Sequence, residues 1–294
     1  MSTIKTIMFK PLSHAKIVPR RSAERGHSNL GWLNSYHTFS FSQYYDPSFQ
    51  SFGSLRVLNE DRVAPKNGFP THRHSNAEIF SYVLSGELTH RDSMIGKSKG
   101  TVSKDDFYRM KRGDVQFTTG GSGIAHSEEN EHSKDEVHFL QIWALPWKQG
   151  LPPTYHTMTF PEEAKREGFV TIISPLKGGP SATADEEKAA VPLMEGTIPI
   201  HADLVMGASI IAQGSSAVWT IGGKDVVRSK SGRHVYVHLP MTKNGKAKIR
   251  LSGNEGVELA EGDGAFVSNV NAGDELHVES IGDAEAEVVV LDSN

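Results

Sequence analysis

Short segments in which apolar and polar residues alternate run along most of the chain, a spacing typical of β-strands with one buried face. They are rich in aromatic and β-branched residues, and Gly, Asp, Asn or Pro separates them. In the first half these segments are residues 37–45, 51–58, 78–90, 114–120 and 136–145. In the second half they are residues 202–212, 216–223, 233–239, 246–253, 263–269, 274–280 and 286–292. Many short strands at close spacing predict an all-β sandwich or barrel.

Helical periodicity is rare by comparison. The best candidate is residues 160–169, FPEEAKREGF, which predict a short helix with Pro161 in its first turn and acidic residues behind it. A Pro-rich segment at 145–157 and a Gly/Ala/Pro-rich segment at 174–192 predict loops between two strand-rich halves.

The predicted boundaries follow from this break. We expect a flexible leader at 1–20, a first domain at 21–150, a linker and crossover segment at 151–200, and a second domain at 165–294 that overlaps the crossover. A Gly-Asp turn leads into a strand in each half, at 113–114 and at 262–263, which indicates a duplicated architecture. The polar segment 97–111 predicts a lengthened hairpin tip.

Composition excludes several classes of protein. The 294 residues are 37% apolar and 22% charged, with a formal net charge of -4, so we expect neither a nucleic-acid binder nor a membrane protein. The absence of cysteine excludes disulfides, zinc fingers, thiol catalysis and iron–sulfur clusters. Any metal site must therefore use histidine and carboxylate ligands.

The N-terminal residues bear on where in the cell the protein is located. Several basic residues and no acidic residue precede Glu24, which leaves a mitochondrial presequence as one alternative. We favour a flexible basic leader, because the segment lacks the Ser/Arg-rich amphipathic character of a presequence. We expect a cytoplasmic protein, with a nuclear location as a second option.

Two short segments carry the candidate chemistry, THRHSNAE at 71–78 and GSGIAHSE at 121–128. Side chains two apart on a strand share a face, so His72, His74 and Glu78 point the same way if their segment is extended throughout. His126 and Glu128 share a face by the same argument. Isolated histidines are usually structural, but two such arrays favour a site for Fe, Mn, Co, Ni, Cu or Zn. Spacing alone leaves open which glutamate is the fourth ligand.

Other polar and aromatic residues lie near these segments. We interpret Asp92, which follows His90 by two residues, as organising a hairpin through bonds to the backbone and not as a ligand. Gln141 and Trp143 share strand parity and face either a pocket or the core.

Some of the remaining side chains we assign to packing. His37, Phe39 and Phe41 are expected to pack in the core, with an apolar cavity wall as the alternative. The histidines of the second half are scattered, so we expect that half to hold no metal and to form one wall of a cleft.

The two segments resemble the motifs of the cupin superfamily. His-x-His-x3-Glu at 72–78 with Gly86 is similar to the first motif, and the Gly121 to Asn130 segment is similar to the second, with Gly121 where most cupins have proline. Stretches 24–49, 69–96, 113–128 and 138–143 resemble the pirin family in particular, across about residues 20–147.

The resemblance implies a bicupin: two jelly-roll β-barrel domains with few short helices, and a metal in the first. It assigns the ligands to His72, His74, His126 and Glu128, and leaves Glu78 as an outer partner or a pocket residue. Two departures stand out. Arg73 replaces the usual proline and should point out of the barrel, and the hairpin after residue 96 is longer than in similar proteins.

The resemblance is strongest to pirins of the quercetin 2,3-dioxygenase type. It implies that a bound divalent metal, Fe(II) by expectation, supports opening of a flavonol ring by O2 with release of CO, with Glu128 or else Glu78 as the base. The alternative is an iron-containing nuclear pirin, a redox-sensitive transcription co-regulator that meets a protein partner and no nucleic acid directly. A structural or storage cupin is a third hypothesis.

Overall fold

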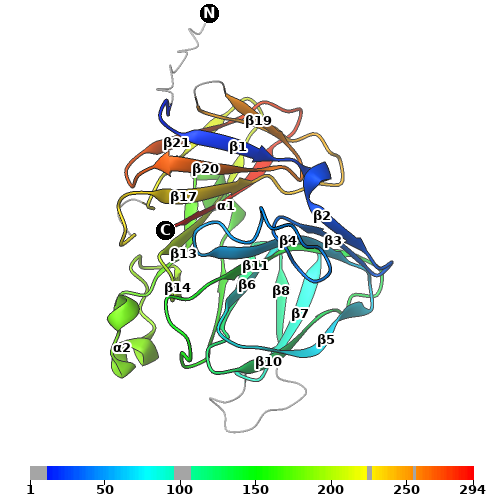
Figure 1. Ribbon diagram of the computed structural model, residues 1–294. Coiled ribbons are helices and arrows are strands. Elements are labelled where there is room, and N and C mark those ends of the chain that lie inside the picture. The colour runs from blue at the N-terminus through cyan, green and yellow to red at the C-terminus, as the bar shows by residue number, and fades with distance from the viewer. Residues whose placement is uncertain (1–11, 96–106, 224–226, 254–255) are drawn as a thin grey trace, which may run out of the picture.

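The computed structural model describes residues 12–95, 107–223, 227–253 and 256–294, which form two stacked β halves (Figure 1). Each half joins a seven-stranded sheet to a four-stranded sheet. In the first half the large sheet runs β12 (Thr154–Thr159), β9 (Asp114–Thr119), β6 (Glu78–Ser85), β11 (Val137–Ala144), β4 (Leu55–Val63), β3 (Leu33–His37), β2 (Gly26–Asn29). Its small sheet runs β5 (Asn67–His74), β10 (Ile124–Asn130), β7 (Glu87–Asp92), β8 (Tyr108–Lys111).

The second half repeats this arrangement. Its large sheet runs β1 (Lys16–Arg20), β20 (Gly264–Val270), β17 (Arg233–His238), β22 (Ala286–Ser293), β15 (Leu204–Ile211), β13 (Val170–Pro175), β14 (Ile198–Ile200). Its small sheet runs β16 (Ser216–Thr220), β21 (Glu275–Ser280), β18 (Lys248–Leu251), β19 (Val257–Ala260). Because the two strand orders match position by position, the predicted bicupin of two jelly-roll barrels is confirmed.

The Gly-Asp turns are equivalent in the two halves as well. Gly113 and Gly262 have φ of 85° and 82°, a left-handed conformation that glycine adopts without strain. Asp114 and Asp263 each accept a hydrogen bond from the backbone N–H three residues earlier, at 3.0 and 3.1 Å. The turns open β9 and β20, which occupy the same position in their sheets.

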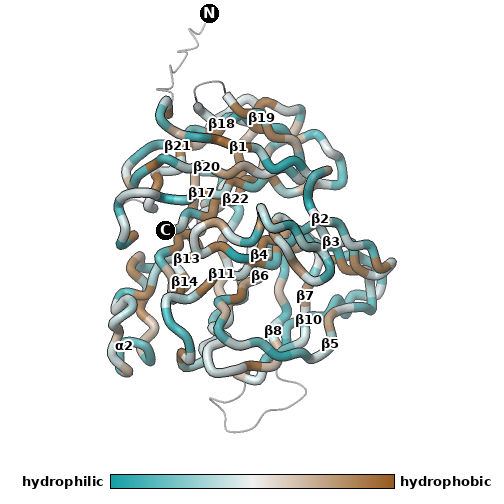
Figure 2. The backbone as a smooth tube through the Cα atoms, in the orientation of Figure 1, coloured by the Kyte–Doolittle hydropathy of each residue, from teal (hydrophilic) through white to brown (hydrophobic). Residues whose placement is uncertain are grey.

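Three clusters of buried apolar side chains hold the layers together, and hydrophobic stretches of backbone run through both halves (Figure 2). One fills the first barrel and includes Val83, Leu88 and Phe139, and a second fills the second barrel. The third contains side chains from both large sheets, among them Phe80 and Met206. The two large sheets therefore face each other, and each small sheet lies on an outer side. This order buries the outer face of β6, β9 and β11 against the second half.

Two predictions about segments expected outside the barrels are wrong. The end of the leader expected to be flexible forms β1, which pairs with β20 of the second half. The segment 174–192 predicted as loop contains the helix α2 (Ala184–Ala189). Its start is a capping box, in which the Thr183 hydroxyl accepts from the Glu186 N–H while the Glu186 carboxylate accepts from the Thr183 N–H. The Thr-x-x-Glu pattern is a helix-start signal, whereas the surrounding Gly and Pro residues favour a loop.

Other predictions in the sequence have simpler outcomes. The helix expected at 160–169 is α1 (Glu162–Glu167), with Pro161 at its N-cap. Of the hairpin tip expected at 97–111, residues 97–106 lie outside the described part of the chain, and Tyr108–Lys111 form β8. Among the described residues, no helix has the length and apolarity that crossing a membrane requires.

Candidate metal centre

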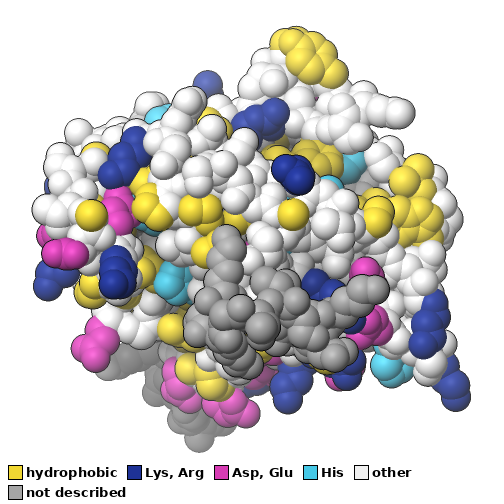
Figure 3. Space-filling model, turned by 90° about the horizontal axis from the view of Figure 1, so that it is seen from below, with side chains coloured by type: hydrophobic (Ala, Val, Ile, Leu, Met, Phe, Trp, Pro, Cys, Tyr) yellow, Lys and Arg dark blue, Asp and Glu magenta, His cyan; other side chains and the backbone are white. Residues whose placement is uncertain are grey.

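Three histidines come together on the small sheet of the first half. His72 and His74 lie on β5, and His126 lies on the adjacent strand β10, directly opposite His72. The Nε2 atoms of His126 and His72 are 3.0 Å apart, and potential ligand atoms of all three residues lie within 4.8 Å of one another. Arg73 between them is exposed, as predicted from strand alternation. Seen from below, the surface of the protein shows a few histidine side chains among interspersed acidic and basic residues (Figure 3).

Glu128 lies inside the same barrel, two residues beyond His126. A β-bulge shifts the register of β10 against β5 between these two residues. The Glu128 carboxylate is 2% exposed and accepts hydrogen bonds from Ser81 at 2.9 Å and from Gln141 at 2.7 Å. Gln141 therefore faces the site and not an apolar core. Ser81 was missed because a lone serine on an apolar strand gives no signal of its partner.

A second group of side chains lies behind His126, deeper in the barrel. His126 Nδ1 is 3.0 Å from His90 Nε2 and 3.9 Å from an Asp92 oxygen, and all three residues are buried. Asp92 also accepts a hydrogen bond from the Met94 N–H at 2.7 Å, the hairpin role predicted for it. His90 Nδ1 is 3.4 Å from the Tyr155 hydroxyl on β12.

Burial keeps these imidazoles neutral. It lowers the pKa of His126 to about 2, with the charges of the neighbouring histidines adding to the effect. Burial likewise lowers the pKa of His74 to about 4 and that of His90 to about 3, each with a further contribution from the charge of His72. Burial raises the pKa of Glu128. Neutral imidazole nitrogens beside a buried carboxylate fit a divalent transition metal, which needs deprotonated ligands and supplies the missing positive charge.

Glu78 lies on the opposite face of the large sheet from this group. The segment 72–78 is not extended throughout, because Asn76 has φ of 53° and the chain turns between β5 and β6. The parity argument therefore fails for Glu78, which points to the interface between the halves. There its carboxylate accepts hydrogen bonds from the Thr119 hydroxyl at 3.1 Å and from the His201 N–H at 3.2 Å.

His201 joins Glu78 to a second carboxylate. Its Nδ1 lies 3.3 Å from Glu78 and its Nε2 lies 2.6 Å from Glu187 on α2. Burial alone would lower the pKa of His201, but hydrogen bonds and charges from Glu78 and Glu187 outweigh it and raise that pKa. The two carboxylates thus favour the protonated form of the histidine, which links the halves.

This link predicts a pH dependence of stability. A folded-state pKa above the unfolded value of 6.5 means that the stabilisation is complete below pH 6.5 and disappears as pH rises through the folded pKa. We expect the unfolding free energies of wild type and His201→Gln to converge above pH 6.5, measured by urea denaturation at a series of pH values. Profiles that stay parallel across this range would contradict protonation of His201 at this link.

An aromatic cleft adjoins the histidines. The Trp143 ring lies 4.9 Å from the His74 ring and 5.5 Å from the Phe41 ring, between centroids. These two aromatics, with Tyr44 and Tyr45, line a cleft of about 550 Å³. Trp143 thus faces the site, and Phe41 lines the apolar wall that was the less favoured alternative. Phe39 is 1% exposed and packs in the core, as expected.

Gly121 has a steric reason to differ from the proline of most cupins. Its φ is 42°, which the proline ring cannot adopt. A Cβ at this position would lie 2.0 Å from the Leu151 carbonyl oxygen. The residue therefore has to be glycine for the loop before β10 to pack against the segment after β11.

The second half carries a similar His-x-Glu step, at His277 and Glu279 on β21. This strand corresponds to β10, but its inward side chains are Leu276 and Val278, which lie in the core of the second barrel. A one-residue difference in phase turns His277 and Glu279 to the other face. Both groups of three potential ligands found among the described residues lie in the first half.

Comparison with known proteins agrees with this picture. The family model for pirin matches residues 19–144. A pirin-like protein of Caulobacter vibrioides is 34% identical over 237 residues, 80% of this chain and 87% of that protein. The quercetin 2,3-dioxygenase of Escherichia coli K12 is 43% identical over 141 residues, which span 48% of this chain and only 57% of that enzyme.

Solved structures extend the similarity to the whole chain. The Escherichia coli pirin YhhW, crystallised in complex with nickel(II), has a TM-score of 0.72 and 28% identity over 95% of this chain and 99% of its own. A quercetin 2,3-dioxygenase of Acinetobacter baumannii has a TM-score of 0.59 at 16% identity, over 96% of this chain and 79% of its own, which shows a shared fold.

Proposed function

The chain belongs to the pirin family, and from this premise we propose that it is a metal-dependent dioxygenase that opens the central ring of a flavonol such as quercetin. O2 is the second substrate, and the 2,3-dioxygenation releases CO. The observation that carries the proposal is the group of His72, His74 and His126, with the buried Glu128 two residues after His126 and an aromatic cleft beside His74. The activity named for the Escherichia coli relative supports the same chemistry.

We assign the metal ligands to His72, His74, His126 and Glu128. His126 and Glu128 are buried on one face of β10, and the half-buried His72 and His74 lie on the adjacent strand β5, which supports this set. Fe(II) is the ion we expect, with Mn, Co, Ni, Cu or Zn as other candidates, and nickel is the ion in the related YhhW structure. A bound divalent ion would act as a Lewis acid that makes a substrate hydroxyl more acidic.

The protein's own side chains would then position the substrate and take its proton. Glu128 is the base we propose, because burial raises its pKa and so increases its affinity for a proton. Glu78 remains the second choice and is less suited, because it faces the interface between the halves. The aromatic cleft beside His74 suits a flat aromatic ligand, and its Trp143 ring would stack on or border such a molecule.

The alternative of a transcription co-regulator without catalysis has no specific support in the described residues.

One assay tests the proposed activity. Protein loaded in turn with Fe(II), Mn(II), Co(II), Ni(II) or Cu(II) is mixed with quercetin in air, and the loss of flavonol absorbance is followed. We expect turnover that falls by about 100-fold or more in His126→Ala, since a lost ligand should cost more than the 10- to 100-fold typical of an outer partner. His132→Ala, a change at a loop histidine of the same half, is the matched control. Absence of turnover with every ion, in protein verified to hold metal, would refute the activity.

A further inference from the structure

The two ring nitrogens of His126 face different surroundings. Nε2 lies 3.0 Å from His72 Nε2, on the side where the three potential ligands gather. Nδ1 lies 3.0 Å from His90 Nε2 in the buried interior. The nearest Asp92 oxygen is 3.9 Å from Nδ1, too far for a hydrogen bond. His90 is therefore the hydrogen-bond partner of the inner nitrogen.

A neutral imidazole has one N–H and one lone pair, so these two contacts decide its tautomer. If Nδ1 of His126 carries the proton, it donates to His90 Nε2, and the Nε2 lone pair is free to bind a metal. His90 must then carry its own proton on Nδ1. That nitrogen lies 3.4 Å from the Tyr155 hydroxyl oxygen, which is able to accept it. Without a metal these hydrogen bonds run the other way: His72 Nδ1 donates to the Pro70 carbonyl oxygen at 2.8 Å, so His72 Nε2 accepts from His126 Nε2, and His90 Nε2 donates to His126 Nδ1. Use of His126 Nε2 as a metal ligand would therefore reverse the hydrogen bond between His126 and His90.

Tyr155 contacts His90 from outside the segment that resembles the family. It lies on β12, beyond residue 144 where the family match ends, and β12 pairs with β9 so that Tyr155 is opposite Thr118. The Tyr155 and His90 rings are 5.6 Å apart between centroids. The crossover segment between the halves therefore supplies part of the surroundings of His126.

We propose, on the basis of the proposed metal site, that His90, held by Tyr155, is a positioning residue that orients the His126 ring and accepts its Nδ1 proton when Nε2 serves as a ligand. A second ion bound by His90, Asp92 and His126 is the competing use of the same atoms. It would require His126 to bind through Nδ1 and Nε2 at once, as an imidazolate. It would also require His90 Nε2 to be a ligand instead of the acceptor for His126. The positioning role needs neither change.

The first measurement is the affinity for Ni(II), by competition with a chelator at fixed pH. We expect His90→Phe, which keeps a ring and removes both nitrogens, to weaken binding by about 10- to 100-fold. Tyr155→Phe should weaken it severalfold. Tyr108→Phe is the control, because its hydroxyl contacts Thr157 and Thr159 instead. Circular dichroism verifies that each variant is folded.

The second measurement is the tautomer of His90 without metal and with Zn(II), by two-bond 15N–1H correlation spectroscopy. We expect the Nε2–H form without metal and the Nδ1–H form with Zn(II), in wild type and in Tyr108→Phe. The proposal is overturned by a His90 tautomer that Zn(II) does not change, or by a Ni(II) affinity of either test variant equal to that of the control. Two ions per wild-type chain and one in His90→Phe would also overturn it. Wild type that binds no metal would refute the proposed function, whereas normal metal binding with an unchanged His90 tautomer would refute the positioning role alone.

Discussion

Replacing Glu128 with glutamine should lower the affinity for a divalent transition metal by more than about 100-fold, whereas Glu78→Gln should change it less than about tenfold. Glu128 shares the barrel interior with the three histidines, and the charge of His72 acts on its pKa. Glu78 lies across the large sheet, where Thr119 and His201 hold it. Glutamine is nearly the same size as glutamate, so the change removes a charged ligand without leaving a cavity.

Metal content by elemental analysis and affinity by chelator competition measure the difference. Glu129→Gln is the matched control, since Glu129 is the next residue on β10 and its side chain is 42% exposed. If Glu78→Gln lost more metal than Glu128→Gln, the general cupin arrangement would apply, and our assignment of the fourth ligand would be wrong. Such a result would also require the segment between β5 and β6 to rearrange.

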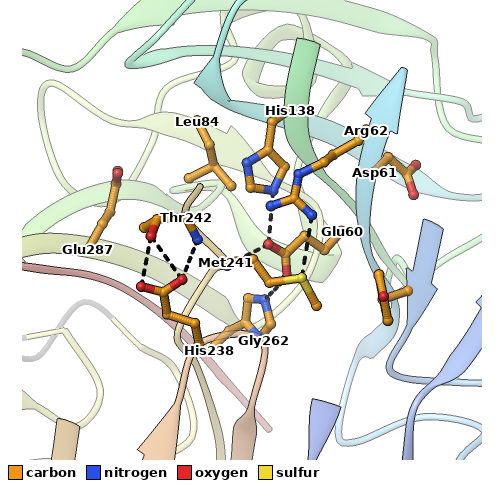
Figure 4. A network of polar contacts seen from close by, with 12 residues as sticks. Glu60, Asp61, Arg62, Leu84, His138, His238, Met241, Thr242, Gly262 and Glu287 are labelled. Carbon is orange, nitrogen blue, oxygen red and sulfur yellow. Dashed lines mark hydrogen bonds and ion pairs between the residues drawn. The ribbon is translucent and has the colours of Figure 1, made fainter. Parts of the chain in front are cut away.

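Replacing Glu60 with alanine should lower the free energy of unfolding by about 3–5 kcal/mol, the cost typical of removing one partner from a buried ion pair. Glu60 on β4 is fully buried between the two halves (Figure 4). One carboxylate oxygen accepts from His138 at 2.8 Å and from the Met241 N–H at 2.6 Å. The other accepts from His238 at 3.1 Å and from Arg25 at 3.2 Å.

The hydrogen bonds around Glu60 stabilise its ionised form. Burial alone would raise the pKa of Glu60, but hydrogen bonds from His138 and His238 lower it well below its usual range. Alanine would leave the guanidinium of Arg25 buried without its carboxylate. Urea unfolding at neutral pH measures the loss, and Glu258→Ala is the control. That carboxylate pairs with Lys248 and Arg250 on an exposed strand, where ion pairs contribute little. Equal shifts in the two variants would contradict a structural role for the Glu60 network.

Local pattern predicted much of the fold, because each strand carries its own alternation and each turn its own glycine or aspartate. The failures have local causes as well. The capping box of α2 is visible in the sequence at Thr183 and Glu186 but was outweighed by the surrounding Gly and Pro. Strand β1 is only five residues long, and its sequence does not indicate a partner strand. Its pairing with β20, about 250 positions later, depends on how the halves meet.

The candidate site divides in the same way. The sequence alone determined that His72 and His74 share a strand face, since their parity is a local property of β5, and that no cysteine takes part in any metal site. The burial of Glu78 and Glu60 between two sheets depends on the tertiary structure, because each would face water if its barrel stood alone. The contact of Tyr155 with His90 depends on it as well. Such side chains acquire their neighbours only after strands far apart in sequence pair and the two barrels pack together.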